Sequence, residues 1–184
     1  MDTLILFLLT LGLAMDCFTI AITNSSVSGL VKPGIPLKTA IAFTFAHVVL
    51  AFAGFWLGSA LQSMFTGQEN LIAFIIFGII GSKMIMEARR KHPKTQVFDI
   101  NEARVIVILS LATAMDAFLA GLAIGVTGLN IYLAGMMLAI TVFILTLGGM
   151  AGGKQLGVDF AKRTAYFGGA FILIASAMML MRFL

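Results

Sequence analysis

Two aspartates stand out because each interrupts a long apolar stretch. Asp16 lies near the middle of a stretch at about 3–26, and Asp116 lies near the middle of one at about 104–127. A carboxylate at the centre of a membrane-spanning helix costs about 2.5–3.5 kcal/mol on insertion scales. Two converging carboxylates repel each other, and a divalent cation between them removes that conflict. Because carboxylate, hydroxyl and carbonyl oxygens suit hard ions such as Mg²⁺, Ca²⁺ and Mn²⁺, the pair predicts a divalent metal site.

Hydroxyl-bearing residues share a helical face with each aspartate. Thr19 follows Asp16 by three positions, and Thr113 precedes Asp116 by three positions. Residues at this spacing lie on one side of a helix, so we expect Thr19 and Thr113 to add oxygen ligands. The alternative is that each aspartate only joins helices through a buried hydrogen bond, although Asn or Thr would do so at lower cost.

Four other side chains that could do chemistry also lie in apolar stretches. His47 fits a metal ligand or proton acceptor, and it fits a helix–helix hydrogen bond equally well. Lys83 and Glu87 are one helical turn apart, which predicts a pair at the membrane interface; a role in gating or a proton path is the alternative. Cys17 is expected to pack in the interior without binding metal.

The segments that must position these residues are membrane-spanning helices. Of the 184 residues, 60% are hydrophobic and 11% are charged, whereas a soluble domain is about 45–50% apolar and about 25% charged. This composition excludes a soluble enzyme and a free nucleic-acid-binding protein. A membrane-spanning helix needs about 20 mostly apolar residues. Stretches that meet this requirement occur at about 3–26, 38–62, 70–88, 104–127, 131–152 and 164–183.

The sequence therefore predicts an all-α, multi-pass membrane protein with six helices in a single domain, residues 1–184. The first stretch begins Met1-Asp2-Thr3 without a basic region, so we expect it to be a retained helix and not a signal peptide. Residues 148–155 (GGMAGGKQ) approach a phosphate-binding loop, but Gln155 stands where Ser or Thr is needed. Their glycines, like Gly54 and Gly58, are expected to allow close helix packing.

Basic residues gather in the loops on one side of the predicted membrane. The loops after the first, third and fifth stretches hold Lys32, Lys38, Arg89, Arg90, Lys91, Lys94, Arg104, Lys154, Lys162 and Arg163. The opposite side has Arg182 alone. The positive-inside rule places the basic side in the cytoplasm and both chain termini outside.

An internal repeat relates the two halves of the chain. Residues 10–18 (TLGLAMDCF) match 110–118 (SLATAMDAF), and 77–86 match 171–180. Between these matches, Gly54, Gly58 and Leu61 correspond to Gly149, Gly153 and Leu156. We predict repeat one at about 1–88, a cytoplasmic loop at 89–103 and repeat two at about 104–184. An odd number of crossings in each unit inverts one copy relative to the other, an arrangement typical of secondary transporters with a site near the midplane. The alternative is that Leu, Ala, Gly and Phe recur by chance in apolar helices.

With its two AMDxF segments and the FGIIGSKMIMEARR stretch, the chain resembles the bacterial manganese efflux pump family (MntP) of the wider lysine-exporter-like superfamily. The paired aspartates, Asp16 and Asp116, are the most specific feature of this resemblance. Lys83 and Glu87 match the family's third segment loosely, and His47 stands at a polar position of the second segment. The resemblance implies export of Mn²⁺ across the cytoplasmic (inner) membrane.

Without a nucleotide-binding motif, transport of this kind must be secondary or passive, and passive uniport of a cation would run inward. Moving a divalent cation out against an inside-negative potential costs about 4.6 kcal/mol per 100 mV, so export needs an incoming ion, most simply a proton. We expect Asp16 and Asp116 to bind both ions, to behave alike, and to need no permanently bound cofactor. The partners are then Mn²⁺, protons and lipid; the sequence leaves homo-oligomer formation open. The alternatives are a non-transporting membrane assembly subunit and an exporter of another small solute.

Overall fold

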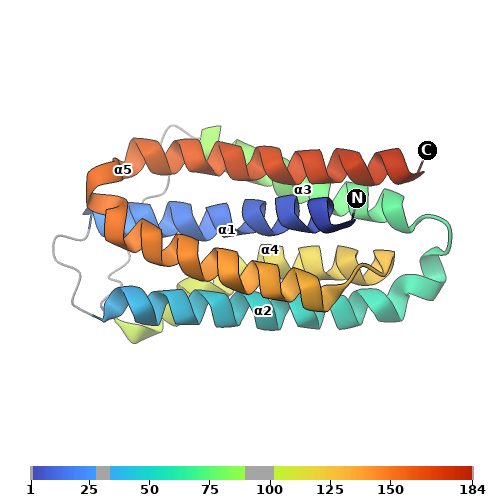
Figure 1. Cartoon of the computed structure of the whole chain (residues 1–184), viewed down its shortest axis with the longest axis horizontal. Coiled ribbons are helices and arrows are strands. Elements are labelled where there is room, and N and C mark those ends of the chain that lie inside the picture. Colours follow the sequence, from blue (N-terminus) through green and yellow to red (C-terminus); the bar gives the residue numbers. More distant parts are fainter. Residues whose placement is uncertain (1, 28–33, 90–101, 184) are drawn as a thin grey trace.

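The computed structural model describes residues 2–27, 34–89 and 102–183, and it is all-helical within these ranges (Figure 1). No strand occurs in the part of the chain so described. The elements in order are α1 (Asp2–Val27), α2 (Ile35–Leu61), the short 3₁₀ helix η1 (Gln62–Phe65), α3 (Glu69–Arg89), α4 (Ala103–Thr127) and α5 (Ile131–Phe183).

Continuous apolar sequence produces these helices because a lipid-embedded backbone must satisfy its hydrogen bonds internally. Five helices of the described chain are long and apolar enough to cross a membrane. The first four begin and end within about three residues of the predicted stretches. Local caps fix the boundaries: Gly128 ends α4 with a φ of 68°, and the Asn130 side chain accepts the backbone N–H groups of Tyr132 and Leu133 at the start of α5.

Helix α5 differs from the sequence prediction. We expected two stretches, 131–152 and 164–183, joined by a connection, but the residues between them are also helical. The backbone leaves the helical region at Gly157, where φ is 72° and ψ is 170°. Only glycine adopts this combination readily, since it has no Cβ. Figure 1 shows that the chain reverses direction here, so α5 consists of a first arm (131–156) and a second arm (158–183) that lie antiparallel.

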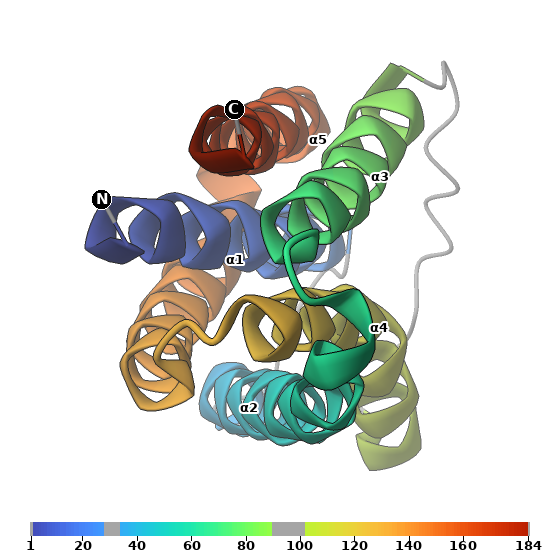
Figure 2. The same cartoon turned by 90° about the vertical axis from the view of Figure 1, so that its right-hand side faces the viewer.

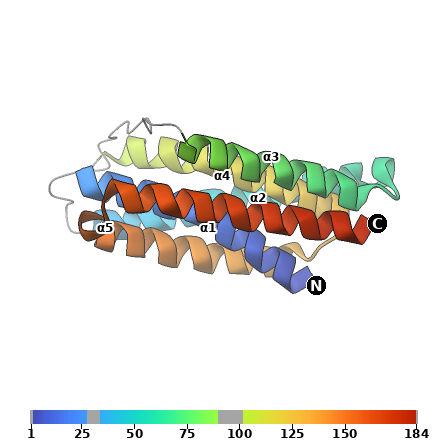
Figure 3. The ribbon, with the colours of Figure 1, turned by 90° about the horizontal axis from the view of Figure 1, so that it is seen from above.

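Both ends of the chain lie at the same end of the bundle (Figures 1 and 3). The guanidinium of Arg182 lies 2.9 Å from the carboxylate of Asp2, which joins the first turn of α1 to the last turn of α5. A chain that traverses the bundle and returns to its starting end has passed along it an even number of times. The two antiparallel arms of α5 account for this even number, because α5 passes along the bundle twice.

Glycines bring two pairs of helices into backbone contact. Gly54 and Gly58 of α2 face α4 so closely that a Cβ at either would overlap a carbonyl oxygen, that of Phe118 or Leu122. In the first arm of α5, Gly149 and Gly153 face α1 in the same way; a Cβ would come within 3.0 Å of the Phe18 oxygen and 2.8 Å of the Ile22 oxygen respectively. The prediction of close packing is confirmed for Gly54, Gly58, Gly149 and Gly153. It is wrong for Gly148, which has nothing within 4 Å of its Cβ position, and for Gly152, which faces only the Leu156 side chain of its own helix.

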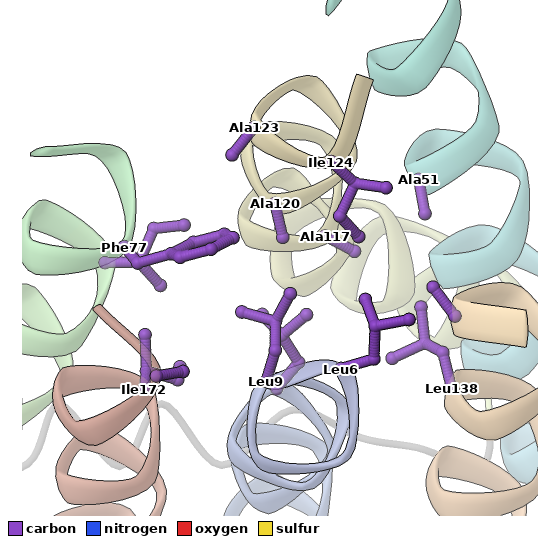
Figure 4. Packing of buried hydrophobic residues seen from close by; sticks show 14 of the residues in the cluster. Leu6, Leu9, Ala51, Phe77, Ala117, Ala120, Ala123, Ile124, Leu138 and Ile172 are labelled. Atoms are coloured by element: carbon purple, nitrogen blue, oxygen red, sulfur yellow. The ribbon is translucent and has the colours of Figure 1, made fainter. Parts of the chain in front are cut away.

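The apolar core forms around α1, which lies in the middle of the bundle when the helices are viewed end-on (Figure 2). Leu6 and Leu9 of α1 point toward Ala117 and Ala120 of α4, with Phe77 of α3 beside them (Figure 4). All of these side chains are almost completely buried.

The outer surface is also apolar. Phe45 is 70% exposed and Trp56 is 72% exposed, and many other large apolar side chains share this outward position. An apolar surface of this extent is compatible with lipid and not with water. The structure therefore describes a multi-pass membrane protein.

Candidate functional site

The carboxylate of Asp116 lies inside the bundle near the middle of α4, and only 8% of the residue is exposed. It is paired with Lys83 of α3, whose Nζ lies 2.8 Å from Oδ1 and 3.1 Å from Oδ2. A buried carboxylate in a membrane segment requires a partner of opposite charge. Lys83 supplies it.

This ion pair corrects the position expected for Lys83. The spacing of Lys83 and Glu87 suggested a pair at the membrane interface, but the Lys83 ammonium points instead to the mid-helix carboxylate of α4. Glu87 is exposed on α3, and its charge acts on Lys83 across one helical turn.

Asp16 lies near the middle of α1 and is partly buried. The charges of Asp116, Glu87 and Lys83 all act on its carboxyl group. The fold therefore gathers three carboxyl groups and one ammonium group from α1, α3 and α4 into one electrostatic neighbourhood. They are not drawn together as a closed ligand cage: no group of three His, Cys, Asp or Glu side chains close enough to hold a metal occurs within residues 2–27, 34–89 and 102–183.

The two predicted threonines form local hydrogen bonds. Thr19 Oγ1 lies 2.8 Å from the carbonyl oxygen of Met15 and 2.9 Å from Oγ1 of Thr164 in the second arm of α5. Thr113 Oγ1 lies 3.1 Å from the carbonyl oxygens of Leu109 and Ser110. Each hydroxyl can donate its hydrogen to its own helix, which leaves an oxygen lone pair as an acceptor. Neither threonine is shown in contact with an aspartate.

His47 is completely enclosed and contacts Cys17. Its Nδ1 lies 2.8 Å from the carbonyl oxygen of Phe43, so Nδ1 carries the proton and donates it. Its Nε2 lies 3.3 Å from Sγ of Cys17, whose S–H is then the donor. Both ring nitrogens are therefore engaged, and His47 ties α2 to α1 next to Asp16.

Comparison with known proteins identifies the family. A model described as "Putative manganese efflux pump" matches residues 32–181. The protein named "Putative manganese efflux pump MntP" in Desulfitobacterium hafniense is 30% identical over 184 residues, which is 100% of this chain and 97% of that protein. The chain belongs to the manganese efflux pump family.

Other relatives in this family are similar over most of their length. The protein of the same name in Citrifermentans bemidjiense is 32% identical over 170 residues, covering 92% of this chain and 90% of that one. The one in Methanoregula boonei is 29% identical over 174 residues, covering 95% and 94%. No solved structure matches the chain.

The sequence of this member of the manganese efflux pump family did not predict two contacts that the structure shows. One is the pair of Lys83 with Asp116, and the other is the contact of Cys17 with His47. The predicted internal repeat offered a signal for both. Cys17 corresponds to Ala117, and Lys83 corresponds to Ala177, so each is a polar residue in the first half without a polar counterpart in the second.

Proposed function

We propose that this protein exports Mn²⁺ from the cytoplasm and that Asp16 and Asp116 bind the ion. The observation that carries the proposal is the charge balance of the site. The site holds three carboxyl groups, those of Asp16, Asp116 and Glu87, and the ammonium group of Lys83; when all four are charged their sum is minus two, which one divalent cation neutralises. Oxygen ligands from the carboxylates and from Thr19 and Thr113 suit a hard divalent ion. His47 becomes a ligand only by giving up its bond with Cys17.

We propose further that the chain crosses the membrane six times as two inverted repeats. The doubled α5 supplies the fifth and sixth crossings, and the Asp2–Arg182 pair fits an even number. Equivalent contacts support the repeat. Gly54 packs on the Phe118 carbonyl and its counterpart Gly149 on that of Phe18; Gly58 packs on Leu122 and Gly153 on Ile22. Each contact in one half is matched by the residues at the corresponding positions of the other half.

The membrane is the cytoplasmic membrane, and both termini lie outside. The basic residues Lys154, Lys162 and Arg163 flank the reversal of α5 at Gly157, at the end of the bundle away from the termini. Lys38, Arg89 and Arg104 lie in helix ends of the same side. The other basic residues of the predicted cytoplasmic side, including those of the 89–103 loop, lie outside the described residues: Lys32, Arg90, Lys91 and Lys94.

Coupling to protons completes the proposal. Export of a divalent cation against an inside-negative potential costs about 4.6 kcal/mol per 100 mV, so the outward step must be driven. The same carboxylates can carry protons inward and Mn²⁺ outward when the site alternates between the two sides.

One observation favours a second candidate. The Lys83–Asp116 pair joins α3 to α4, as it would in a non-transporting membrane assembly subunit whose charges only hold helices together. Export of a different small solute is the remaining alternative, and central carboxylates favour a cation over an anionic solute.

The test is Mn²⁺ transport in proteoliposomes with a metal-sensitive dye inside. Wild type should accumulate or release Mn²⁺ with a pH gradient, and Asp16→Asn should lose transport while it still inserts. Asp159→Asn is the matched control, because Asp159 is an exposed aspartate in α5. If Asp16→Asn and Asp159→Asn transport equally well, the carboxylate is structural and the assembly-subunit reading stands. Transport of Mn²⁺ but not of an amino acid by the wild type excludes the other-solute alternative.

A further inference from the structure

Lys83 occupies the two oxygens of Asp116 that a bound metal would use. Its Nζ lies within hydrogen-bonding distance of both Oδ1 and Oδ2. Carboxylates bind hard divalent ions through these same oxygens, with one or both. An ammonium group and a metal ion cannot occupy this position together, because their charges repel and their volumes overlap. Metal binding to Asp116 therefore requires Lys83 to leave.

The surroundings of Lys83 allow that movement. The Lys83 side chain is 47% exposed, whereas that of Asp116 is 12% exposed, so the lysine covers the carboxylate from the outer side. Its long stem is flexible. Glu87 follows one turn later on the same face of α3, and its charge already acts on Lys83. A displaced ammonium group thus has a second carboxylate within reach, closer to the end of α3 at Arg89.

Among the residues that the structure describes, no cation is paired with Asp16. The position that corresponds to Lys83 in the second half of the chain is Ala177. Within the described part of the chain, a lysine is thus paired with Asp116 and not with Asp16.

We propose that Lys83 is a tethered competitor for the metal at Asp116. It neutralises Asp116 while the site is empty, and it swings to Glu87 when the divalent ion enters. This inference rests on the proposed function and adds the group that the ion must displace. In the empty site Lys83 keeps the buried carboxylate of Asp116 paired, so the metal-free protein can change conformation without the penalty of an unpaired charge at that position.

The test is Mn²⁺ binding to the purified full-length protein by isothermal titration. Lys83→Met keeps the apolar stem and removes the competing charge, so Mn²⁺ should bind about fivefold tighter or more. Lys83→Arg keeps the charge and adds a planar fork that pairs with both carboxylate oxygens, so Mn²⁺ should bind more weakly than to wild type. Lys154→Met, which removes an exposed lysine of α5, should bind as wild type does.

Glu87→Gln gives an independent arm, because it removes the second position for the ammonium group and should weaken Mn²⁺ binding. In the double variant Lys83→Met/Glu87→Gln most of that weakening should disappear, since no lysine remains to be accommodated. If Lys83→Met does not fold, Lys83→Arg and Glu87→Gln still decide the matter. Wild-type binding with no tightening in folded Lys83→Met, or no weakening in Lys83→Arg, overturns this inference alone. A wild type that neither binds nor transports Mn²⁺ overturns the proposed function instead.

Discussion

At the scale of single residues, Asp16 and Asp116 are not equivalent, although the repeat suggested that they would behave alike. Asp116→Asn leaves the Lys83 ammonium without its partner, whereas Asp16→Asn removes no ion pair that the structure shows. We expect both variants to lose Mn²⁺ transport. The free energy of unfolding of Asp116→Asn should be about 1 kcal/mol lower than that of Asp16→Asn. The melting temperature in detergent measures the difference.

A double variant provides the control for this prediction. Asp116→Asn/Lys83→Met removes both charges and should recover most of the stability, because an unpaired charge is costlier than a missing pair. Equal melting temperatures for Asp16→Asn and Asp116→Asn would show that the ion pair contributes nothing to stability.

Glu87 should modulate transport without being required for it. The residue is exposed, so its charge can reach water at little cost. We expect Glu87→Gln to fold normally and to reduce the rate of Mn²⁺ transport only in part, through its effect on Lys83. Glu69→Gln at the other end of α3 is the matched control and should transport as wild type does. Complete loss in well-folded Glu87→Gln would instead make Glu87 a direct ligand.

The sequence located the candidate residues but not their partners. Asp16 and Asp116 were predictable because a charge inside an apolar stretch is costly and conspicuous. The partner of Lys83 was not, because Glu87 offered a nearby match at helical spacing, while the approach of α3 to α4 depends on tertiary packing. For the same reason Cys17 was expected to pack only, and its contact with His47 comes from the approach of α1 to α2.

At the scale of helices, the contact between α2 and α4 depends on the absence of side chains. A Cβ at Gly54 would overlap the backbone of Phe118, which cannot move aside as a flexible side chain could. We expect Gly54→Ala to destabilise the protein by about 1–3 kcal/mol, the usual cost of overpacking. Gly148→Ala is the control, since nothing lies within 4 Å of its Cβ position. Thermal unfolding in detergent should separate the two, and equal stability would contradict the tight crossing.

The reversal of α5 depends on one residue. At Gly157 a φ of 72° with a ψ of 170° is open to glycine and strained for alanine, so Gly157→Ala should cost about 1–3 kcal/mol. Gly152→Ala is the control in the same helix, where a Cβ would meet only the end of the Leu156 side chain at 3.4 Å. The same thermal unfolding measurement checks this prediction. A Gly157→Ala variant as stable as Gly152→Ala would mean that the bend is not fixed by this backbone conformation.

The hydropathy pattern predicted the helix boundaries where the chain passes from lipid to water. It did not predict the boundary within α5, where no such change decides it. The first four helices follow the apolar stretches because a backbone embedded in lipid must satisfy its hydrogen bonds internally, which a helix does. Around Gly157 the basic residues Lys154, Lys162 and Arg163 were assigned to a loop between two apolar stretches. The residues of this connection, except Gly157, can all adopt a helical conformation. Outside the apolar stretches, the hydropathy pattern does not distinguish a helical connection from an irregular one.

For the molecule as a whole, the proposed topology makes one prediction that does not depend on the metal site. The Asp2–Arg182 pair holds the two termini together, so they must lie on the same side of the membrane. By the positive-inside rule, the basic residues at the opposite end predict that this side is outside. Alkaline phosphatase fused after Leu184 should therefore be active, and green fluorescent protein fused there should be dark. As the control, the same reporters fused after Arg89, at the end of the third predicted crossing, should give the reverse result. A fluorescent fusion after Leu184 would place the termini in the cytoplasm. This result would contradict the orientation inferred from the charges. Since the direction of the site would then be reversed, it would also remove the argument for export.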